Sequence, residues 1–219
     1  MIPRYLPVSR TARYFALGPE PPAAREIWIA LHGYAQLAER FLTQLAVLDD
    51  GSTHIAAPEA LSRFYLETQR NGRHADLVGA TWLTREAREA DLDDHLRYLD
   101  RLHDHLLTGV AGPPRLTVLG FSQGAVMAAR WVARSPHPPD HTVLWGSSLP
   151  DDVSPGALAQ VLRGHRVTLV AGDNDPIVPP GAIETSADDL RSAGVSARAL
   201  RFEGGHLIPP LPLLQTAGR

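Results

Sequence analysis

The sequence predicts an α/β fold in which a mostly parallel, twisted sheet carries helices on both faces. Short β-rich runs alternate with longer helical patterns along the 219 residues, which is typical of strands joined by right-handed crossovers. Several β-rich runs are continuously apolar, as strands buried on both faces require. No solenoid repeat or low-complexity segment interrupts this alternation, so we expect one domain with a minimal cap over residues 1–219.

The first half of the chain contains the clearest helix of the sequence. Over residues 84–107, leucines recur at helical spacing as one apolar stripe, and Thr84 is expected to cap the helix start. A shorter helix is expected over 36–48, where leucine and phenylalanine keep the same spacing. The strands expected in this half are residues 11–18, 26–33 and 54–60.

The second half repeats the alternation of strand and helix. Its expected helices are 124–134, which is apolar on most sides and should be buried, and 182–193. The tail from Pro209 is rich in proline and receives no prediction. The strands expected here are residues 115–120, 141–148, 166–172 and 195–204.

Composition excludes several functional classes. The net charge of −3, from 21 basic and 24 acidic residues, gives no field that would attract nucleic acid. The chain has no cysteine and no lysine, which excludes disulfides, thiolate sites, Schiff-base chemistry and a P-loop. We expect no cofactor. No apolar stretch is long enough for a signal peptide or a membrane span, so we expect a cytoplasmic protein. The sequence leaves the oligomeric state open, and a homodimer is one expectation.

The pentapeptide GFSQG at residues 120–124 places Ser122 where an apolar strand gives way to a helix. A strand, a sharp turn and a helix are the setting that a G-x-S-x-G nucleophile requires, because the serine must present its Oγ on a strained bend. Gly120 and Gly124 provide room, since a Cβ at either position would collide with the neighbouring strand or helix. We therefore expect Ser122 to be a nucleophile.

A nucleophilic serine needs a base and an acid that orients the base, and in such folds they follow in the order Ser, Asp/Glu, His. His206, in FEGGH, comes just after the last expected strand. The segment AGDNDPIVP offers Asp173 and Asp175 as alternative acids at the end of another buried strand. Because the carboxyl ends of parallel strands meet at one edge of the sheet, these side chains are expected to meet Ser122 there.

An oxyanion hole for this serine needs backbone N–H groups. Gln123, at the helix N-terminus after the nucleophile, should supply one of them. The loop LHGYAQ after the expected strand 26–33 should supply the other through the N–H of Tyr34, with Gly33 allowing the bend. We interpret His32 as a structural histidine that holds this loop.

No metal site is expected. His103 and His105 resemble a metal-binding pair, but residues two apart on a helix point to different faces. His95, His137, His141 and His165 lack partners at ligand spacing.

The connection 61–83 is long and has little periodicity, which is typical of a functional loop. We expect its aromatic side chains to roof a pocket for the substrate, with the alternative that they only anchor the loop on the core. Further lining residues are expected beside the motifs. The complete set of expected substrate-binding residues is Phe64, Tyr65, Trp82, Trp145, Ile177 and Leu207.

The motifs LHGY, APE, GFSQG, AGDNDPIVP and GGH together resemble the α/β-hydrolase superfamily. Within it the chain is similar to the phospholipase/carboxylesterase group, which includes acyl-protein thioesterases and bacterial serine esterases. The resemblance implies an α/β-hydrolase fold, with Ser122 as nucleophile, Asp175 rather than Asp173 as acid and His206 as base. It also places the oxyanion donors at Tyr34 and Gln123.

The predicted activity is hydrolysis of carboxylic esters, with thioesters as an extension, through an acyl-serine. The loop after HG reads Tyr-Ala-Gln where acyl-protein thioesterases have a Leu-Gly-Asp type sequence, and no long apolar loop for a lipid chain is identifiable. Small or medium acyl groups are therefore expected. The alternatives are a ligand-binding protein that kept the fold, and an acyltransferase that uses the same acyl-serine.

Overall fold

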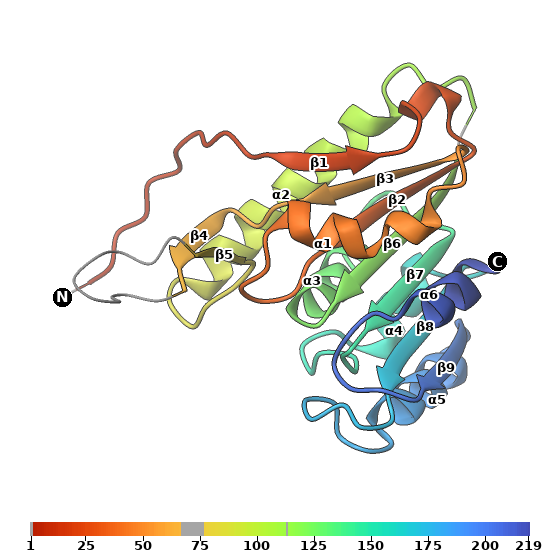
Figure 1. Ribbon diagram of the computed structural model, residues 1–219. Coiled ribbons are helices and arrows are strands. Elements are labelled where there is room, and N and C mark those ends of the chain that lie inside the picture. The colour runs from red at the N-terminus through yellow and green to blue at the C-terminus, as the bar shows by residue number, and fades with distance from the viewer. Residues whose placement is uncertain (1, 67–76, 113) are drawn as a thin grey trace.

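A computed structural model describes residues 2–66, 77–112 and 114–219. Its centre is a twisted sheet of 7 strands in the order β1-β3-β2-β6-β7-β8-β9 (Figure 1). Only the pair of β1 and β3 is antiparallel, whereas the other neighbours run parallel. The strands are β1 (Tyr14–Leu17), β2 (Glu26–Leu31), β3 (Thr53–Pro58), β6 (Arg115–Phe121), β7 (His141–Trp145), β8 (Arg166–Gly172) and β9 (Ser196–Phe202).

Helices cover both faces of this sheet, and each face has its own apolar core. One core joins the sheet to α2, α3, α4 and α5, and the other joins it to α1 and α6. The predicted α/β fold is therefore confirmed. The helices are α1 (Ala38–Gln44), α2 (Arg88–Leu107), α3 (Gln123–Val132), α4 (Pro155–Val161), α5 (Ala182–Ser192) and α6 (Pro210–Ala217), with 3₁₀ turns η1 (Pro21–Ala23) and η2 (Ala46–Leu48).

The start of α2 is a correction to the sequence-based prediction. The helix begins at Arg88 after Ala87, which has a left-handed φ of 47° and interrupts the helical path. Thr84 lies before this break, where its Oγ1 accepts a hydrogen bond of 3.2 Å from the Glu86 N–H. Thr84 therefore stabilises a turn and does not cap the helix.

The connection between β3 and α2 contains an element that the sequence did not predict. β4 (Ser62–Tyr65) and β5 (Val78–Thr81) pair antiparallel as a separate sheet. Residues 67–76, which also belong to the predicted roof, lie outside the described residues. The hairpin packs on the loop after β2, because a Cβ at Gly79 would lie 2.5 Å from the Ala35 carbonyl oxygen. The hairpin is thus held against the end of β2 where chemistry was expected.

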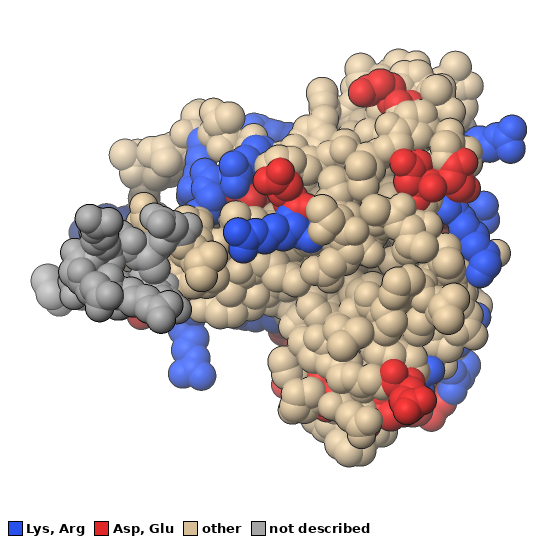
Figure 2. All heavy atoms as spheres, viewed as in Figure 1, with Lys and Arg blue, Asp and Glu red and all other residues tan. Residues whose placement is uncertain are grey.

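Charged side chains of both signs are interspersed over the described part of the face in Figure 2. No helix among the described residues is long and apolar enough to cross a bilayer.

Candidate active site

Ser122 lies on a strained bend between β6 and α3. Its φ of 54° and ψ of −118° are unusual for a residue with a side chain, and such a conformation costs on the order of 1–3 kcal/mol. The Ser122 N–H donates a hydrogen bond of 2.7 Å to the Trp145 carbonyl at the end of β7, which helps to hold the bend. The strand–turn–helix setting predicted for this serine is present.

The glycines on either side of Ser122 are required by close backbone approach. A Cβ at Gly120 would lie 2.3 Å from the Gly124 carbonyl oxygen, inside the start of α3. A Cβ at Gly124 would lie 2.2 Å from the Leu31 carbonyl oxygen, at the end of β2. Both distances are shorter than a carbon and an oxygen can approach, so only glycine lets α3 pack this tightly on the sheet.

Asp175 and His206 come together at the carboxyl ends of β8 and β9. Asp175 Oδ2 lies 2.7 Å from His206 Nδ1, and the aspartate side chain is only 1% exposed. Asp175 Oδ1 accepts hydrogen bonds from the N–H groups of Ile177 and Val178, at 2.8 and 3.2 Å. Because the carboxylate accepts, His206 Nδ1 carries the proton and Nε2 is left as the basic nitrogen.

The imidazole of His206 lies beside the bend that holds Ser122. Its ring centroid is 4.8 Å from that of Phe121, the residue before the serine. A Cβ on Gly146, just after β7, would lie 2.8 Å from His206 Cε1. Among the described residues no hydrogen bond joins Ser122 to His206, so the structure brings the serine and the imidazole to one place without a direct bond between them.

The alternative acid, Asp173, lies on the same loop but in a different environment. Its side chain is exposed, and its backbone N–H donates a 2.9 Å hydrogen bond to the Phe202 carbonyl. The carboxylate that contacts His206 is that of Asp175.

Two hydrogen bonds fix the loop that is expected to supply an oxyanion donor. The Gly33 N–H donates to Gln36 Oε1 at 2.7 Å, and the Ala35 N–H donates to the Ala80 carbonyl of β5 at 2.9 Å. Within the described residues, nothing accepts a hydrogen bond from the N–H of Tyr34 or Gln123. These are the N–H groups that the sequence analysis selected.

His32 holds the base of this loop, as interpreted from the sequence. Its Nδ1 bonds the Gly33 carbonyl at 2.8 Å, and its Nε2 accepts from the Ala60 N–H at 3.1 Å. Burial lowers the pKa of His32 below its usual value, so the ring stays neutral and Nε2 remains an acceptor.

The side chain of Gln123 has a role that the sequence analysis missed. Its Oε1 accepts from the Trp82 N–H at 3.0 Å, and its Nε2 donates to the Leu83 carbonyl at 2.8 Å and to Thr81 Oγ1 at 3.0 Å. The residue that follows the expected nucleophile is thereby tied to the end of β5. The motif gives Gln123 a backbone role, and nothing local in the sequence indicates the partner 40 residues away.

Two of the expected substrate-binding residues are buried, which corrects the sequence-based prediction. Trp82 is 0% exposed, and its Nε1 donates to the His32 carbonyl at 2.8 Å. Trp145 is 1% exposed, and its Nε1 donates to the Leu207 carbonyl at 2.9 Å. Both indoles satisfy their only polar group inside the core, so they support the loops and do not line an open surface.

The other expected pocket residues are accessible to different degrees. Ile177 and Leu207 are exposed and lie next in the chain to the segment that holds Asp175 and to His206. Phe64 is partly buried, with its ring centroid 5.4 Å from that of Tyr34, and Tyr65 is exposed on β4. These side chains remain candidates for substrate contact.

A comparison with known protein families identifies the family of this chain. A model of the family described as serine hydrolase (FSH1) matches residues 27–216, which include every residue discussed above as a candidate for catalysis. This chain belongs to the serine hydrolase (FSH1) family. The predicted α/β-hydrolase superfamily is thereby confirmed, and the protein is a hydrolase. No curated protein matches the chain by sequence.

Solved structures similar to this serine hydrolase share its fold over nearly the whole chain. The esterase PE8 is 26% identical, covers 95% of this chain and 98% of its own, and has a TM-score of 0.71. The Zea mays acyl-protein thioesterase 2 is 19% identical, with coverage of 95% and 97% and a TM-score of 0.69. The Bacillus cereus carboxylesterase is 17% identical, with coverage of 94% and 92% and a TM-score of 0.69.

Proposed function

We propose that this serine hydrolase cleaves carboxylic esters through an acyl-serine on Ser122. The observation that carries the proposal is the 2.7 Å contact between Asp175 and His206, made beside a serine held on a strained bend. An imidazole oriented in this way can act as a general base, and a serine activated by such a base is a nucleophile.

In the proposed mechanism, His206 Nε2 removes the hydroxyl proton as Ser122 Oγ attacks the ester carbonyl. The oxyanion accepts hydrogen bonds from the N–H groups of Tyr34 and Gln123, which have no other acceptor among the described residues. His206 then protonates the alcohol, which leaves, and the acyl group stays on Ser122. Water activated by His206 releases the acid. Contacts of this kind are often long without substrate and tighten when it binds, so the missing bond between Ser122 and His206 is compatible with this role.

The accessible rim of the site supports a proposal for the substrate class. Ile177 and Leu207 present exposed apolar side chains beside the proposed base and its acid. Phe64 and Tyr65 come from the hairpin packed against the loop of Tyr34. We propose that this rim accepts small or medium acyl esters, with thioesters as a second class.

Substitution of Ser122 by alanine tests the proposal. We expect hydrolysis of a p-nitrophenyl ester to fall by about 10⁴-fold or more, since the acyl acceptor is gone. The melting temperature should not fall, because no cap or core contact is removed. Ser192→Ala, on the exposed surface of α5, is the matched control and should keep full activity. Only the wild type and the control should be labelled by a fluorophosphonate; a Ser122→Ala variant that still hydrolyses the ester would refute the proposal.

A further inference from the structure

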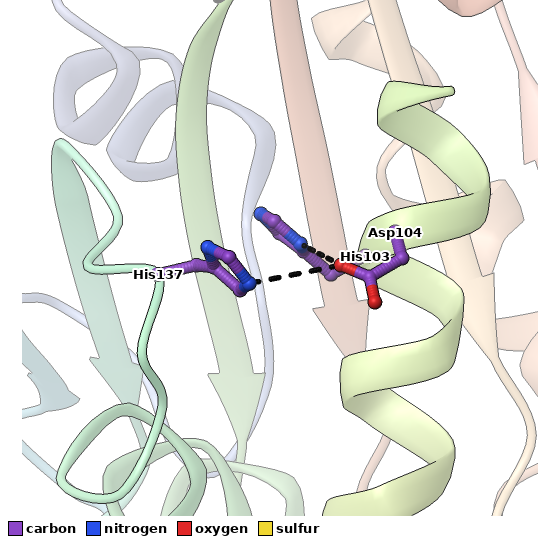
Figure 3. A group of neighbouring side chains, drawn as sticks. All are labelled: His103, Asp104 and His137. Atoms are coloured by element: carbon purple, nitrogen blue, oxygen red, sulfur yellow. Dashed lines mark hydrogen bonds and ion pairs between the residues drawn. The ribbon is translucent and has the colours of Figure 1, made fainter.

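A cluster of potential metal ligands lies at the opposite end of the sheet from Ser122. His103 and Asp104 project from the last turns of α2, and His137 projects toward them from the loop between α3 and β7 (Figure 3). Asp104 Oδ1 lies 3.2 Å from His103 Nδ1 and 3.7 Å from His137 Nε2. One ligand atom from each residue lies within 4.8 Å of the others.

Prolines and a hydrogen bond restrict the backbone of the loop that carries His137. Pro136 precedes the histidine and Pro138 follows it, and proline fixes one backbone dihedral at each position. Ser135 Oγ accepts a 3.1 Å hydrogen bond from the His137 N–H, and this serine is buried. A ligand whose backbone is held in place before the ion arrives loses less conformational entropy on binding, so this loop favours a site over a chance encounter of side chains.

The helix on the other side of the cluster is equally fixed. Asp100, one turn before the cluster on α2, accepts a 2.8 Å hydrogen bond from Trp131 Nε1 on α3. His103 itself is 5% exposed, whereas the Asp104 side chain is 67% exposed and that of His137 is 46% exposed. The cluster thus has one rigid, buried ligand and two that can adjust at the surface, where an ion can enter.

We propose that His103, Asp104 and His137 bind one divalent transition-metal ion, for which Zn²⁺ is the best match. Imidazole and carboxylate are ligands that Zn²⁺ prefers, and three protein ligands leave a fourth position for water. Bonds of about 2.0–2.2 Å place tetrahedral ligand atoms roughly 3.4 Å apart, close to the 3.2 Å between Asp104 Oδ1 and His103 Nδ1. The Asp104 carboxylate contributes one negative charge, which attracts the positive ion, and the two imidazoles coordinate it through neutral nitrogens.

One rearrangement is required before the ion can bind. The rings of His103 and His137 stack with centroids 4.3 Å apart and an interplanar angle of 13°. An ion must lie in the plane of each coordinating ring, and two parallel rings cannot meet that condition together. The half-exposed His137 must therefore turn its ring, which needs only side-chain rotation because its backbone is already in place.

The neighbouring His105 is not part of this site. It lies on another face of α2, where its Nε2 is 3.2 Å from the Tyr14 hydroxyl. The sequence-based argument against the pair His103 and His105 was sound, but the partner of His103 comes from a loop that is distant in sequence. His105 is therefore a matched control on the same helix.

The proposed site does not depend on the esterase mechanism. His137 precedes β7, at the amino end of the strands, whereas Ser122, Asp175 and His206 follow the carboxyl ends. A bound ion would join the end of α2 to the loop before β7 and would raise the melting temperature without changing ester hydrolysis.

Calorimetric titration of the wild type with Zn²⁺ at neutral pH tests the proposal. We expect one ion per chain and a higher melting temperature with Zn²⁺ than with a chelator. His137→Ala should weaken Zn²⁺ binding by at least about tenfold and abolish the thermal shift, and it should fold because its ring is half exposed. His105→Ala should bind as the wild type does. With Co²⁺ as the probe, the wild type should show the visible absorption of a low-coordinate site, and His137→Ala should not.

Two results would overturn the proposal. The first is the absence of binding by the wild type at millimolar Zn²⁺. The second is binding by His137→Ala with the affinity and stoichiometry of the wild type, which would place the ion elsewhere, for example at Asp175 and His206. Esterase activity of His137→Ala, measured in parallel, separates failure of the metal site from failure of the proposed function.

Discussion

At the scale of single residues, Asp173 and Asp175 show how position decides chemical role. They lie two positions apart in one loop and carry the same side chain, but only Asp175 is buried against His206. The carboxylate of Asp175 accepts bonds from the Ile177 and Val178 N–H groups, which fix its orientation. The side chain of Asp173 is exposed to solvent.

This difference makes a matched pair of variants informative. Asp175→Asn should reduce the kcat of ester hydrolysis by about 10⁴-fold, because an amide in this place no longer holds the proton on His206 Nδ1. Asp173→Asn should change kcat by less than about threefold, since its carboxylate does not contact the histidine. Steady-state kinetics of both variants gives the comparison. Equal losses in the two variants would mean that Asp175 is not the orienting acid.

At the scale of elements, the parallel strands were predictable because burial on both faces leaves an apolar run in the sequence. Residues 26–33 and 166–172 carry such runs and form β2 and β8. β4 was missed because only alternate residues of this short strand are partly buried, and its partner is distant in sequence. The helix α6 was not predicted because its prolines, Pro210 and Pro212, obscure the helical pattern, although proline fits the first turn of a helix, whose N–H groups have no partner.

The residues of the candidate site that belong to local sequence motifs could be predicted from the sequence. Ser122 and His206 lie in glycine-rich turns at strand ends, and such turns can be recognised without tertiary information. The positions of Trp82 and Trp145 could not be found in this way. An aromatic residue beside a motif has the same sequence signature whether it faces the substrate or the core, and only the packing of distant elements decides between these outcomes.

The side chain of Gln123 ties the end of the β4 and β5 hairpin to the bend of Ser122. Gln123→Ala keeps the backbone N–H but removes the bonds to Thr81, Trp82 and Leu83. We expect the free energy of unfolding to fall by about 2–3 kcal/mol, because partners near the core lose their hydrogen bonds. We also expect a lower kcat, since the oxyanion N–H is less well positioned. Urea unfolding measures the free energy of unfolding, and steady-state kinetics measures kcat. Gln160→Ala, on the exposed side of α4, is the control. If Gln123→Ala changes neither quantity, other contacts hold the hairpin.

At the scale of the whole molecule, buried histidines make folding dependent on pH. His95 lies on α2, with its Nε2 accepting a 2.9 Å hydrogen bond from the Leu61 N–H, and burial lowers its pKa to about 4. His141 begins β7, and burial, together with nearby arginines, lowers its pKa to about 4. The pKa of His32 is lowered for the same reason. His141 lies apart on β7, whereas His32 and His95 both pack on Trp82, and His32 contributes to the lowered pKa of His95, so the effects of these two are coupled.

The folded chain should therefore lose stability in mild acid. In the unfolded chain a histidine takes up its proton near pH 6.5, whereas folded His95 and His141 stay neutral until about pH 4. Between these values the unfolded state binds more protons, so the free energy of unfolding is greatest above pH 6.5 and falls as the pH decreases toward 4. His95 and His141 can each account for up to about 3 kcal/mol of that loss.

Urea unfolding at a series of pH values between 7 and 4.5 measures this effect, and His95→Gln isolates one contribution. The glutamine Oε1 can accept the Leu61 N–H in place of His95 Nε2 but cannot be protonated, so the variant should lose less stability than the wild type as the pH falls. His105→Gln places the same substitution on an exposed position of the same helix and should retain the pH dependence of the wild type. If His95→Gln and the wild type lose stability equally, protonation of His95 does not contribute to the acid sensitivity.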